Sequence, residues 1–502
     1  MDPWINIDRW SFLRPVVIYG MRGVGAGPFL CLHMVPFRRR CAAFVEGFIW
    51  RCSLNMAHRD SEFLGTEPVG SLLIRLSLPA MVGMFVQATY NMVDALFIGW
   101  GVGPLGLAGT AVVFPVQFAA MAFATMGGVG TASLVSRSLG AGDVGTARRA
   151  MGNLMIMGVV LGGLLASLCA LGISPLLELL GASPEVMPHA RGYLGVILLG
   201  FPLIILGVGM NSVLRAQGRA KLAMVTMFVS AGTNVVLDYI FVFPLGMGVR
   251  GAAWATVISQ GVMVIWLLWH YFVRGGVLSP GMGDMRPDLR VLGQILSVGL
   301  SEFTRLSASG VVAALVVGSL QRYGSYQAVA AYGVVNRVVS LAFMPIVGVG
   351  QGLQPILGYN YGAGKLDRAL RAVYLSLAGA SVISTGAFLV MLLFPEEIFS
   401  LFTSDVSLVS LGARTLRTMG MGFALVGLQV AGTGVFQAVG KGLVAFMLSL
   451  SRQVFLFIPL LLLLPPVLGL KGVWLAFPLS DLMSAAITAG MLVPHLNAMR
   501  DR

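Results

Sequence analysis

Long apolar stretches, separated by short segments with charges, glycines and prolines, follow one another from about residue 70 to the C-terminal end. Several exceed the roughly 20 residues that a helix needs to cross the hydrocarbon core of a bilayer. We therefore expect twelve membrane-spanning helices. Their predicted ranges are 72–98, 107–136, 148–172, 190–214, 220–243, 250–272, 291–318, 325–355, 368–394, 412–437, 443–465 and 470–492. The pattern predicts an all-α polytopic membrane protein.

The composition supports this prediction, because the 502 residues are 57% hydrophobic and only 11% charged. A typical soluble domain carries about 25% charged residues. So few charges cannot cover a water-soluble surface, which excludes a soluble enzyme, a nucleic-acid-binding protein and a disulfide-stapled secreted domain. The net charge of +13 then concerns orientation in the membrane.

Lys and Arg side chains concentrate in alternate loops, which is typical of cytoplasmic loops. From residue 56 onward there are 26 of them: 17 lie in loops on the side of the N-terminal lead, 6 lie on the other side and 3 lie within spans. This asymmetry predicts a multi-pass protein of the plasma (inner) membrane with both termini in the cytoplasm.

Residues 1–66 do not follow the pattern of the rest. They contain Cys31, Cys41 and Cys52, three of the four cysteines, and their arginine cluster follows short apolar runs, unlike the order in a signal peptide. Two interpretations stay open: an extension without a fold of its own, including a start codon assigned too early, and an arm on the membrane surface. Cys169 alone supports neither a disulfide framework nor a cysteine metal site.

An internal repeat is visible at an offset of 222 residues. Residues 140–150 align with 362–372 with six identities in eleven positions, and two further anchors fall within one residue of the same offset. Because each half holds six spans, both enter from the same side and are related by an axis along the membrane normal. We expect an N-lobe at 67–275, a C-lobe at 276–495 and a cytoplasmic tail at 496–502, with a substrate cavity between the lobes.

Four acidic side chains fall within predicted spans: Asp94, Asp238, Glu302 and Asp481. An ionisable group at the bilayer centre costs about 2.5–3.5 kcal/mol on insertion scales, so each acid should face the protein interior or water. Asp481 is interpreted as structural. For Glu302, pairing with Arg305 one turn away and a functional role both stay open.

The first half carries the densest set of such polar groups. We call it the N-half cluster, and it comprises Gln87, Tyr90, Asn91, Asp94, Asn234, Asp238 and Thr256. Gln87, Asn91 and Asp94 share one helical face because they are spaced i, i+4, i+7. Asp94, Asp238 and Thr256 are expected at a similar depth, near the outer ends of their spans.

The N-half cluster suits a cation or a proton. Asp94, Asn234 and Asp238 are predicted ligands for Na⁺, since hard cations prefer carboxylate, amide and hydroxyl oxygens. A buried carboxylate can equally hold a proton, and a third interpretation is that the two acids only hydrogen-bond neighbouring helices. At the repeat offset Val316 and Leu456 replace Asp94 and Asn234, so the site is predicted to be asymmetric.

Pro79 lies within the first span, where it removes a helical hydrogen bond and clashes with the carbonyl of Arg75. The span should therefore be able to bend there and to move Asp94, although a static kink is the alternative. Gly362–Lys365 lacks the residues of a phosphate loop, and the five histidines have no metal-ligand spacing. We expect neither an enzyme nor a bound cofactor.

Several short motifs carry a resemblance to a known family. They are Leu76–Pro79, Tyr90–Asn91 with Asp94–Gly99, Asn234 with Asp238–Phe243, Gly248 with Gly251–Thr256, and Ser451–Gln453 with Pro459. In this order and with the repeat, they resemble the multidrug and toxic compound extrusion (MATE) family, especially its prokaryotic DNA-damage-inducible and Gram-positive multidrug branches. The resemblance covers about residues 66–495 and leaves the N-terminal extension outside it.

The resemblance implies a twelve-helix, two-lobe secondary transporter that exports organic, often cationic compounds in exchange for Na⁺ or H⁺. The positions that match the family's coupling network are Gln87, Tyr90, Asp94, Asn234, Asp238 and Thr256. Asn211 matches a fourth-helix amide, and Glu302 lies in the helix where some branches place a second cation-binding acid. Tyr90, Asn211 and Glu302 are candidates for the substrate cavity.

Two functions stay open. An antiporter of this family would take small cationic, amphipathic organic substrates, with Na⁺ or H⁺ as coupling ion. A lipid-linked precursor flippase would need several cations for a pyrophosphate, whereas the spans contain only Arg305, Arg337 and Arg452 against four acids. The charge balance favours the antiporter. We expect its partners to be these substrates and the lipid bilayer, with no nucleic acid, and we expect a monomer.

Overall fold

The computed structural model of the protein describes residues 61–274, 278–281 and 283–501, so most of the predicted N-terminal extension lies outside the described residues. Every regular element in this part of the chain is helical. Twelve helical segments are long and apolar enough to cross a membrane. The predicted all-α fold with twelve spans is confirmed.

The first lobe contains six spans and one short helix beside them. They are α2 (Val69–Gly101), α3 (Pro104–Gly140), α4 (Val144–Leu171), the short α5 (Ile173–Leu179), α6 (Met187–Ile197) continued by η2 (Leu198–Gly200) and α7 (Phe201–Ala216), α8 (Ala220–Val242) and α9 (Gly248–Phe272). A short 3-10 helix, η1 (Ser61–Gly65), precedes them.

The second lobe repeats this order. Its elements are α10 (Leu289–Tyr323), α11 (Tyr326–Gly362), α12 (Leu366–Leu393), the short α13 (Pro395–Ser400), α14 (Val406–Gly420) continued by η3 (Phe423–Leu425) and α15 (Val426–Ala438), α16 (Gly442–Leu450) continued by η4 (Ser451–Phe457), α17 (Ile458–Leu463) and α18 (Pro465–Leu468), and α19 (Leu470–Arg500). The η4 segment is a π-helix inside the eleventh span.

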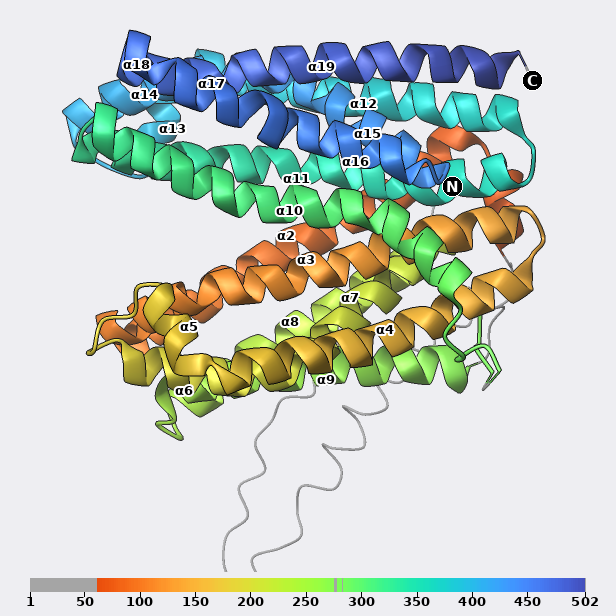
Figure 1. The fold of residues 1–502 in the computed structure, drawn as a ribbon, viewed down its shortest axis with the longest axis horizontal. Helices are drawn as coiled ribbons and strands as arrows, with labels where there is room; N and C mark the ends of the chain where they lie inside the picture. The colour runs from red at the N-terminus through yellow and green to blue at the C-terminus, as the bar shows by residue number, and fades with distance from the viewer. Residues whose placement is uncertain (1–60, 275–277, 282, 502) are drawn as a thin grey trace, which may run out of the picture. The chain divides into compact units, whose positions relative to one another are not determined.

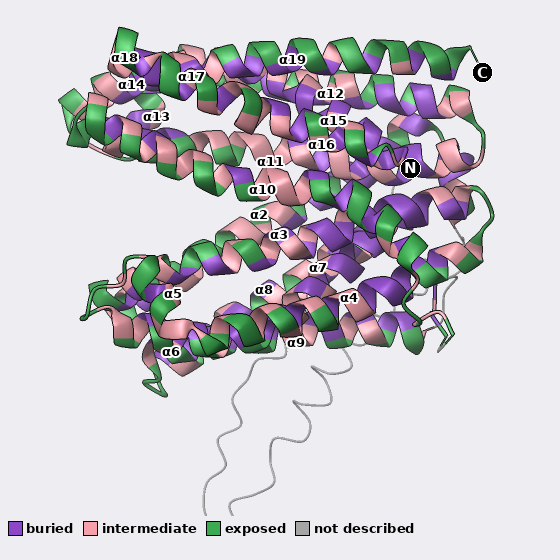
Figure 2. Ribbon diagram, viewed as in Figure 1, coloured by how far each residue is buried: buried purple, intermediate pink, exposed green. Residues whose placement is uncertain are grey.

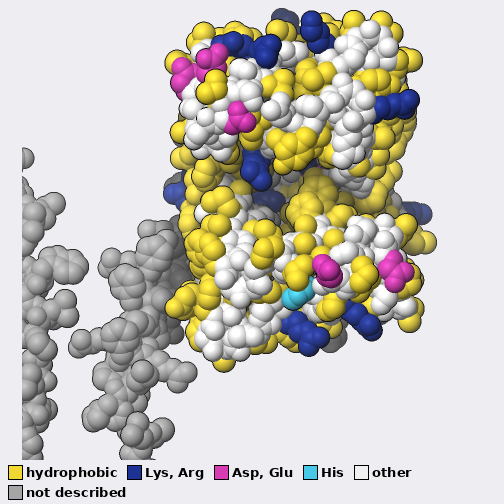
Figure 3. Space-filling view, turned by 90° about the vertical axis from the view of Figure 1, so that its left-hand side faces the viewer, with side chains coloured by type: hydrophobic (Ala, Val, Ile, Leu, Met, Phe, Trp, Pro, Cys, Tyr) yellow, Lys and Arg dark blue, Asp and Glu magenta, His cyan; other side chains and the backbone are white. Residues whose placement is uncertain are grey.

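The two lobes contact each other at one end of the helices and separate toward the other (Figure 1). We call the closed end the one that holds the turns at 140–144 and 362–366, and the open end the one that holds the turns at 101–104 and 323–326. Figure 3 looks onto the open end and shows a hollow between the lobes, walled mainly by hydrophobic side chains with Lys or Arg side chains among them.

At the closed end the two halves of the repeat make the same contact twice. A Cβ on Gly140 would lie 1.9 Å from the carbonyl oxygen of Tyr359, and a Cβ on Gly362 would lie 2.1 Å from that of Arg137. The repeat offset of 222 relates Gly140 to Gly362 and Arg137 to Tyr359. Each contact is therefore the equivalent of the other, as a two-fold axis between the lobes requires.

Close backbone approach continues along α3 and α10. Cβ atoms on Gly130 and Gly299 would meet the carbonyl oxygens of Ile295 and Met126 at 2.0 and 2.1 Å. Buried residues are frequent along these closed-end halves, whereas exposed residues are more common toward the open end (Figure 2). The lobes are thus packed tightly over only part of their length.

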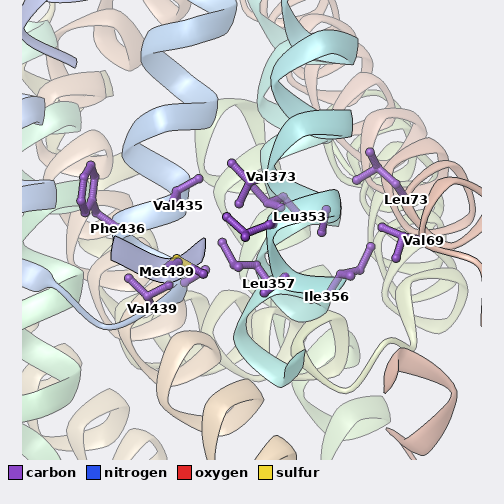
Figure 4. Packing of buried hydrophobic residues seen from close by; sticks show 14 of the residues in the cluster. Val69, Leu73, Leu353, Ile356, Leu357, Val373, Val435, Phe436, Val439 and Met499 are labelled. Atoms are coloured by element: carbon purple, nitrogen blue, oxygen red, sulfur yellow. The ribbon is translucent and has the colours of Figure 1, made fainter. Parts of the chain in front are cut away.

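An apolar core at the closed end joins the lobes. Val69 and Leu73 of α2 are 4% and 8% exposed and belong to one cluster with Leu353, Ile356 and Leu357 of α11. Figure 4 shows these side chains beside one another, together with others from α12, α15 and α19. Burying large aliphatic side chains stabilises by about 1.5–3 kcal/mol each, which makes this core a substantial part of the closed-end contact.

The short η1 helix is bound by side chains of the second lobe. Buried Asn360 donates to the carbonyl of Leu64 at 2.9 Å, and Lys365 donates to that of Gly65 at 3.0 Å. Arg368 donates to the carbonyl of Glu67 at 2.5 Å. On its other side, η1 packs on Gly218 of the first lobe, whose Cβ would meet the ring of Phe63 and the side chain of Leu64. We call this arrangement the η1 clasp.

Candidate functional site

The central residues of the N-half cluster lie in the open-end halves of α2, α8 and α9, which pack side by side. Helix α8 begins directly after a turn in which Gly218 has φ +78°, a conformation that favours glycine. From there α8 buries Asn234 and Asp238, which are 1% and 0% exposed. Thr256 of α9 is 8% exposed, and Asp94 of α2 is partly buried.

The carboxylates of Asp94 and Asp238 lie close to each other. Among the described residues, however, Asp94 Oδ1 and both carboxylate oxygens of Asp238 have no hydrogen-bond partner. Two ionised carboxylates cannot donate to each other. A shared proton would join them, and a cation between them would do the same.

Asn234 lies one turn before Asp238 on α8. Its side-chain nitrogen donates to Thr256 Oγ1 at 3.5 Å, which ties α8 to α9, while its Oδ1 is buried without a partner among the described residues. Buried polar atoms are nearly always hydrogen-bonded or bound to water or an ion. The site therefore offers four buried oxygens that lack a donor, which suits a proton or a hard cation.

The other members of the N-half cluster differ in how close they lie to Asp94 and Asp238. The Tyr90 phenol lies close to Asp94, Asp238 and Gln87. Asn91 is exposed. The described residues contain no group of three or more His, Cys, Asp or Glu that could hold a metal ion. A cation here would therefore depend on amide and hydroxyl oxygens as well.

Two residues near the acid pair were missed by the sequence analysis. Tyr193 of α6 is 3% exposed and lies close to both Asp94 and Asp238, and Gln117 of α3 donates to its phenol oxygen at 3.4 Å. Gln117 is a lone polar residue within an apolar stretch, and Tyr193 follows His189 and Arg191 at the start of its span. Neither stands out as part of the site, because neither shares a helix with a residue of the N-half cluster.

Two further predicted residues lie elsewhere in the first lobe. Asn211 is buried toward the closed end, where it donates to the carbonyl of Ala223 at 2.9 Å and accepts from Arg215; the structure does not bring it to the acid pair. Pro79 is buried within α2, which runs through it without a break. It lies between Ser77, which contacts Gly352 of α11, and the acid pair.

In the second lobe, Glu302 and Arg305 pair with each other on α10. Arg305 donates to both carboxylate oxygens of Glu302, and its Nε lies 3.1 Å from Oε2. This is the pairing that the sequence had left open. A matched pair needs no further ion, so Glu302, unlike the first-lobe acids, has a neutralising partner in the described structure.

Asp481 is also paired. Arg452, in the π-helical η4, donates through Nε to Asp481 Oδ1 at 2.8 Å, and the next residue, Gln453, donates to Ser309 of α10 at 2.9 Å. A π-helical turn shifts the side chains that follow it relative to an α-helix. Here the turn coincides with contacts from the eleventh span to α19 and α10, which matches the structural role expected for Asp481.

Comparison with known proteins places these features in one context. The sequence model of the MatE family matches the chain twice, at residues 79–240 and 302–463, once in each lobe. "Multidrug export protein MepA" of Staphylococcus aureus (strain MRSA252) is 28% identical over 439 residues, which are 87% of this chain and 95% of that protein.

Solved structures agree with the sequence match. "MATE multidrug transporter DinF-BH", solved in complex with a ligand, is 37% identical with a TM-score of 0.80, covering 87% of this chain and 98% of that one. A MATE family multidrug resistance transporter described as "outward-facing" is 27% identical with a TM-score of 0.82. The match covers 88% of this chain and 98% of that one. Both similarities extend over the two lobes.

Proposed function

The chain belongs to the MatE family, and from this we propose that it is a secondary active antiporter that exports organic, often cationic compounds in exchange for Na⁺ or H⁺. The proposal rests on the facing pair of Asp94 and Asp238, whose buried oxygens lack donors among the described residues. The multidrug export of one relative and the ligand bound by another multidrug transporter support organic compounds as the class of substrate.

Coupling follows from the electrostatics of the pair. Two ionised carboxylates that face each other repel, and a proton or a Na⁺ between them removes the repulsion and draws α2 toward α8. Because α2 also contacts α11 at the closed end through Ser77 and Met81, a change in α2 can reach the lobe interface. Bending at Pro79 would let the part of α2 that carries Asp94 change direction relative to the part that carries Ser77.

Exchange requires that the ion and the substrate favour different conformations. A ligand that binds two states equally shifts neither. In this scheme the ion binds between α2 and α8, the substrate binds between the lobes, and each binding event opposes the other. We assign Tyr90 and Asn91, which lie on α2 within one turn of Asp94, to this communication.

The membrane orientation is part of the proposal. The loops at the closed end carry most of the Lys and Arg side chains, so we place this end in the cytoplasm of a plasma (inner) membrane, with both termini there. The described conformation is then open to the outside. The lobe boundaries at 67–275 and 276–495, the tail at 496–502 and a monomeric state stay predictions.

A lipid-linked precursor flippase is less well supported. A pyrophosphate group would call for several available cations in the cavity. Arg305 and Arg452 are each paired with an acid, Glu302 and Asp481, which leaves Arg337 as the remaining intramembrane arginine among those that the sequence identified.

Drug accumulation in an efflux-deficient bacterial host tests the proposal. Wild type is compared with Asp94→Asn and Asp238→Asn while a Na⁺ gradient and a proton gradient are imposed separately. Each variant removes a charge that the coupling ion must neutralise, so we expect export to fall at least about tenfold.

The matched control is Asp367→Asn, which removes an exposed acid of α12 and should leave export unchanged. Unchanged export by both acid-pair variants would rule out the coupling site. Failure of the wild type to export any organic cation under either gradient would contradict the antiporter and favour the flippase.

A further inference from the structure

Arg337 lies on the face of α11 that meets the first lobe. Toward the closed end, Gly348 and Gly352 of α11 approach Met81 and Ser77 of α2 so closely that a Cβ would lie 2.3 and 2.1 Å from their side chains. Arg337 precedes Gly348 by three helical turns and so has nearly the same direction around the helix, about 16 Å nearer the open end. The lobes have separated there, so Arg337 faces the hollow between them.

The opposite face of α11 excludes the alternative direction. Val335, Ile346 and Val349 are 0%, 0% and 5% exposed and belong to the apolar core of the second lobe. Arg337 is exposed, and no described residue forms a hydrogen bond or an ion pair with it. An unpaired guanidinium is costly in lipid, so a water-filled cavity is the surrounding that accommodates it at this depth.

The walls near Arg337 are apolar. Leu341, one turn further along α11, is 47% exposed, and Met92, three turns beyond Met81 on α2, is 62% exposed. The hollow seen from the open end has the same character, with hydrophobic walls and basic side chains (Figure 3). Because Glu302 is held by Arg305, it does not supply the counter-charge for Arg337. The surroundings of Arg337 thus combine an apolar surface with a cation that no described acidic residue pairs with.

We propose that Arg337 is a binding subsite for the carboxylate of an amphipathic organic substrate. This deepens the proposed export function and rests on it. The planar guanidinium matches a carboxylate with two parallel hydrogen bonds. A single arginine suits a monoanionic group, whereas a lipid-linked pyrophosphate would need more cations than the cavity offers.

A pair of dyes with the same ring system isolates the carboxylate. Rhodamine 6G is an ethyl ester, and rhodamine 19 is the same dye with a free carboxylate. Binding of both to the purified full chain in lipid nanodiscs is measured by fluorescence anisotropy. We expect Arg337→Gln to weaken rhodamine 19 binding at least about tenfold and rhodamine 6G binding less than about twofold.

Two further variants separate the subsite from general effects. Arg337→Lys keeps the charge but lacks the planar guanidinium, and we expect the affinity for rhodamine 19 to fall about threefold. Arg322→Gln removes an exposed arginine that lies over the ring of Tyr323 at the open end and should change neither dye. Elution of each variant like the wild type in size-exclusion chromatography shows that it is folded.

The outcomes are distinct. An unchanged ratio of the two dye affinities in Arg337→Gln, or an equal loss for both dyes, overturns the subsite while leaving the export function standing. Binding of neither dye by the wild type contradicts the export function and the subsite together. A selective loss of rhodamine 19 that Arg322→Gln reproduces would assign the effect to net charge and also overturn the subsite.

Discussion

Asp238 is fully buried, and both of its carboxylate oxygens lack a donor among the described residues. An uncompensated buried charge is costly, so this residue needs a proton or a cation beside it. The two candidates differ in what else they require. A proton needs a single oxygen, whereas Na⁺ needs several, and the unpaired Oδ1 of Asn234 one turn away is the nearest additional one on the same helix.

Asn234→Leu should therefore distinguish the coupling ions. The substitution removes the amide oxygen at similar volume, and Leu456 occupies the equivalent position of the second lobe. We expect export driven by Na⁺ to fall at least about tenfold and export driven by protons to stay within about threefold. Export from vesicles under each imposed gradient measures both. Asn497→Leu, at an exposed amide of α19, is the control, and equal losses under both gradients would contradict the distinction.

At the scale of elements, the η1 clasp connects a five-residue helix to both lobes. Asn360 and Lys365 of the second lobe donate to its carbonyl groups, and Arg368 donates to that of Glu67 just after it, while Phe63 and Leu64 pack on Gly218 of the first lobe. In the described conformation the clasp therefore stabilises the closed end. Any state in which the lobes separate there must release η1 from one side.

Arg368→Gln should loosen the η1 clasp. The arginine donates to the carbonyl of Glu67 and to Asn360 Oδ1, and hydrogen bonds from charged groups contribute about 1.5–3 kcal/mol. We expect backbone hydrogen exchange at residues 61–72 to become about tenfold faster. Arg371→Gln, an exposed arginine one turn further along α12, should leave exchange unchanged. Equal protection in both variants would show that η1 is held by its apolar contacts alone.

The elements were predicted better than the contacts between them. The first span, predicted at 72–98, is observed at Val69–Gly101, because the helix continues through Gly70, Ser71 and Gly99, where the apolar pattern ends. Hydropathy could not reveal the π-helical η4 or the short α5, since neither breaks an apolar run of the required length. Helix ends and internal irregularities depend on packing, which periodicity does not record.

The same limit applies to the candidate site. The similar depth predicted for Asp94 and Asp238 agrees with their close approach, since depth follows from counting turns along each helix. The approach of Tyr193 could not be predicted, because it depends on which helices become neighbours and how each is rotated. For the same reason the sequence did not show that Arg452 pairs with Asp481 across 29 positions.

At the scale of the whole molecule, the two lobes are held by contacts that leave no room for a side chain. The approach of Gly140 to Tyr359 and of Gly362 to Arg137 means that the closed end forms only if both positions stay small. Since these contacts are equivalent through the repeat, they should contribute similarly to the stability of the closed end. A change at either position should separate the lobes at the same place.

Gly140→Val and Gly362→Val should open the closed end. The new side chain would overlap a backbone oxygen, so packing must yield, at a typical cost of about 1–3 kcal/mol. We expect faster hydrogen exchange at residues 130–140 and 352–362 in each variant and at least a tenfold loss of export. Gly379→Val, where a Cβ meets nothing within 4 Å, is the matched control. Wild-type exchange at both segments in either variant would refute the role of this contact.

The reciprocal contact also bears on how the halves came to differ. Two identical subunits around a two-fold axis must carry every substitution on both sides of their interface. Joined in one chain, the halves share a glycine at Gly140 and Gly362 on the contact surface but differ inside: Asp94 and Asn234 in one correspond to Val316 and Leu456 in the other. Covalent linkage thus permits a division of labour, in which one lobe carries the acid pair and the other does not.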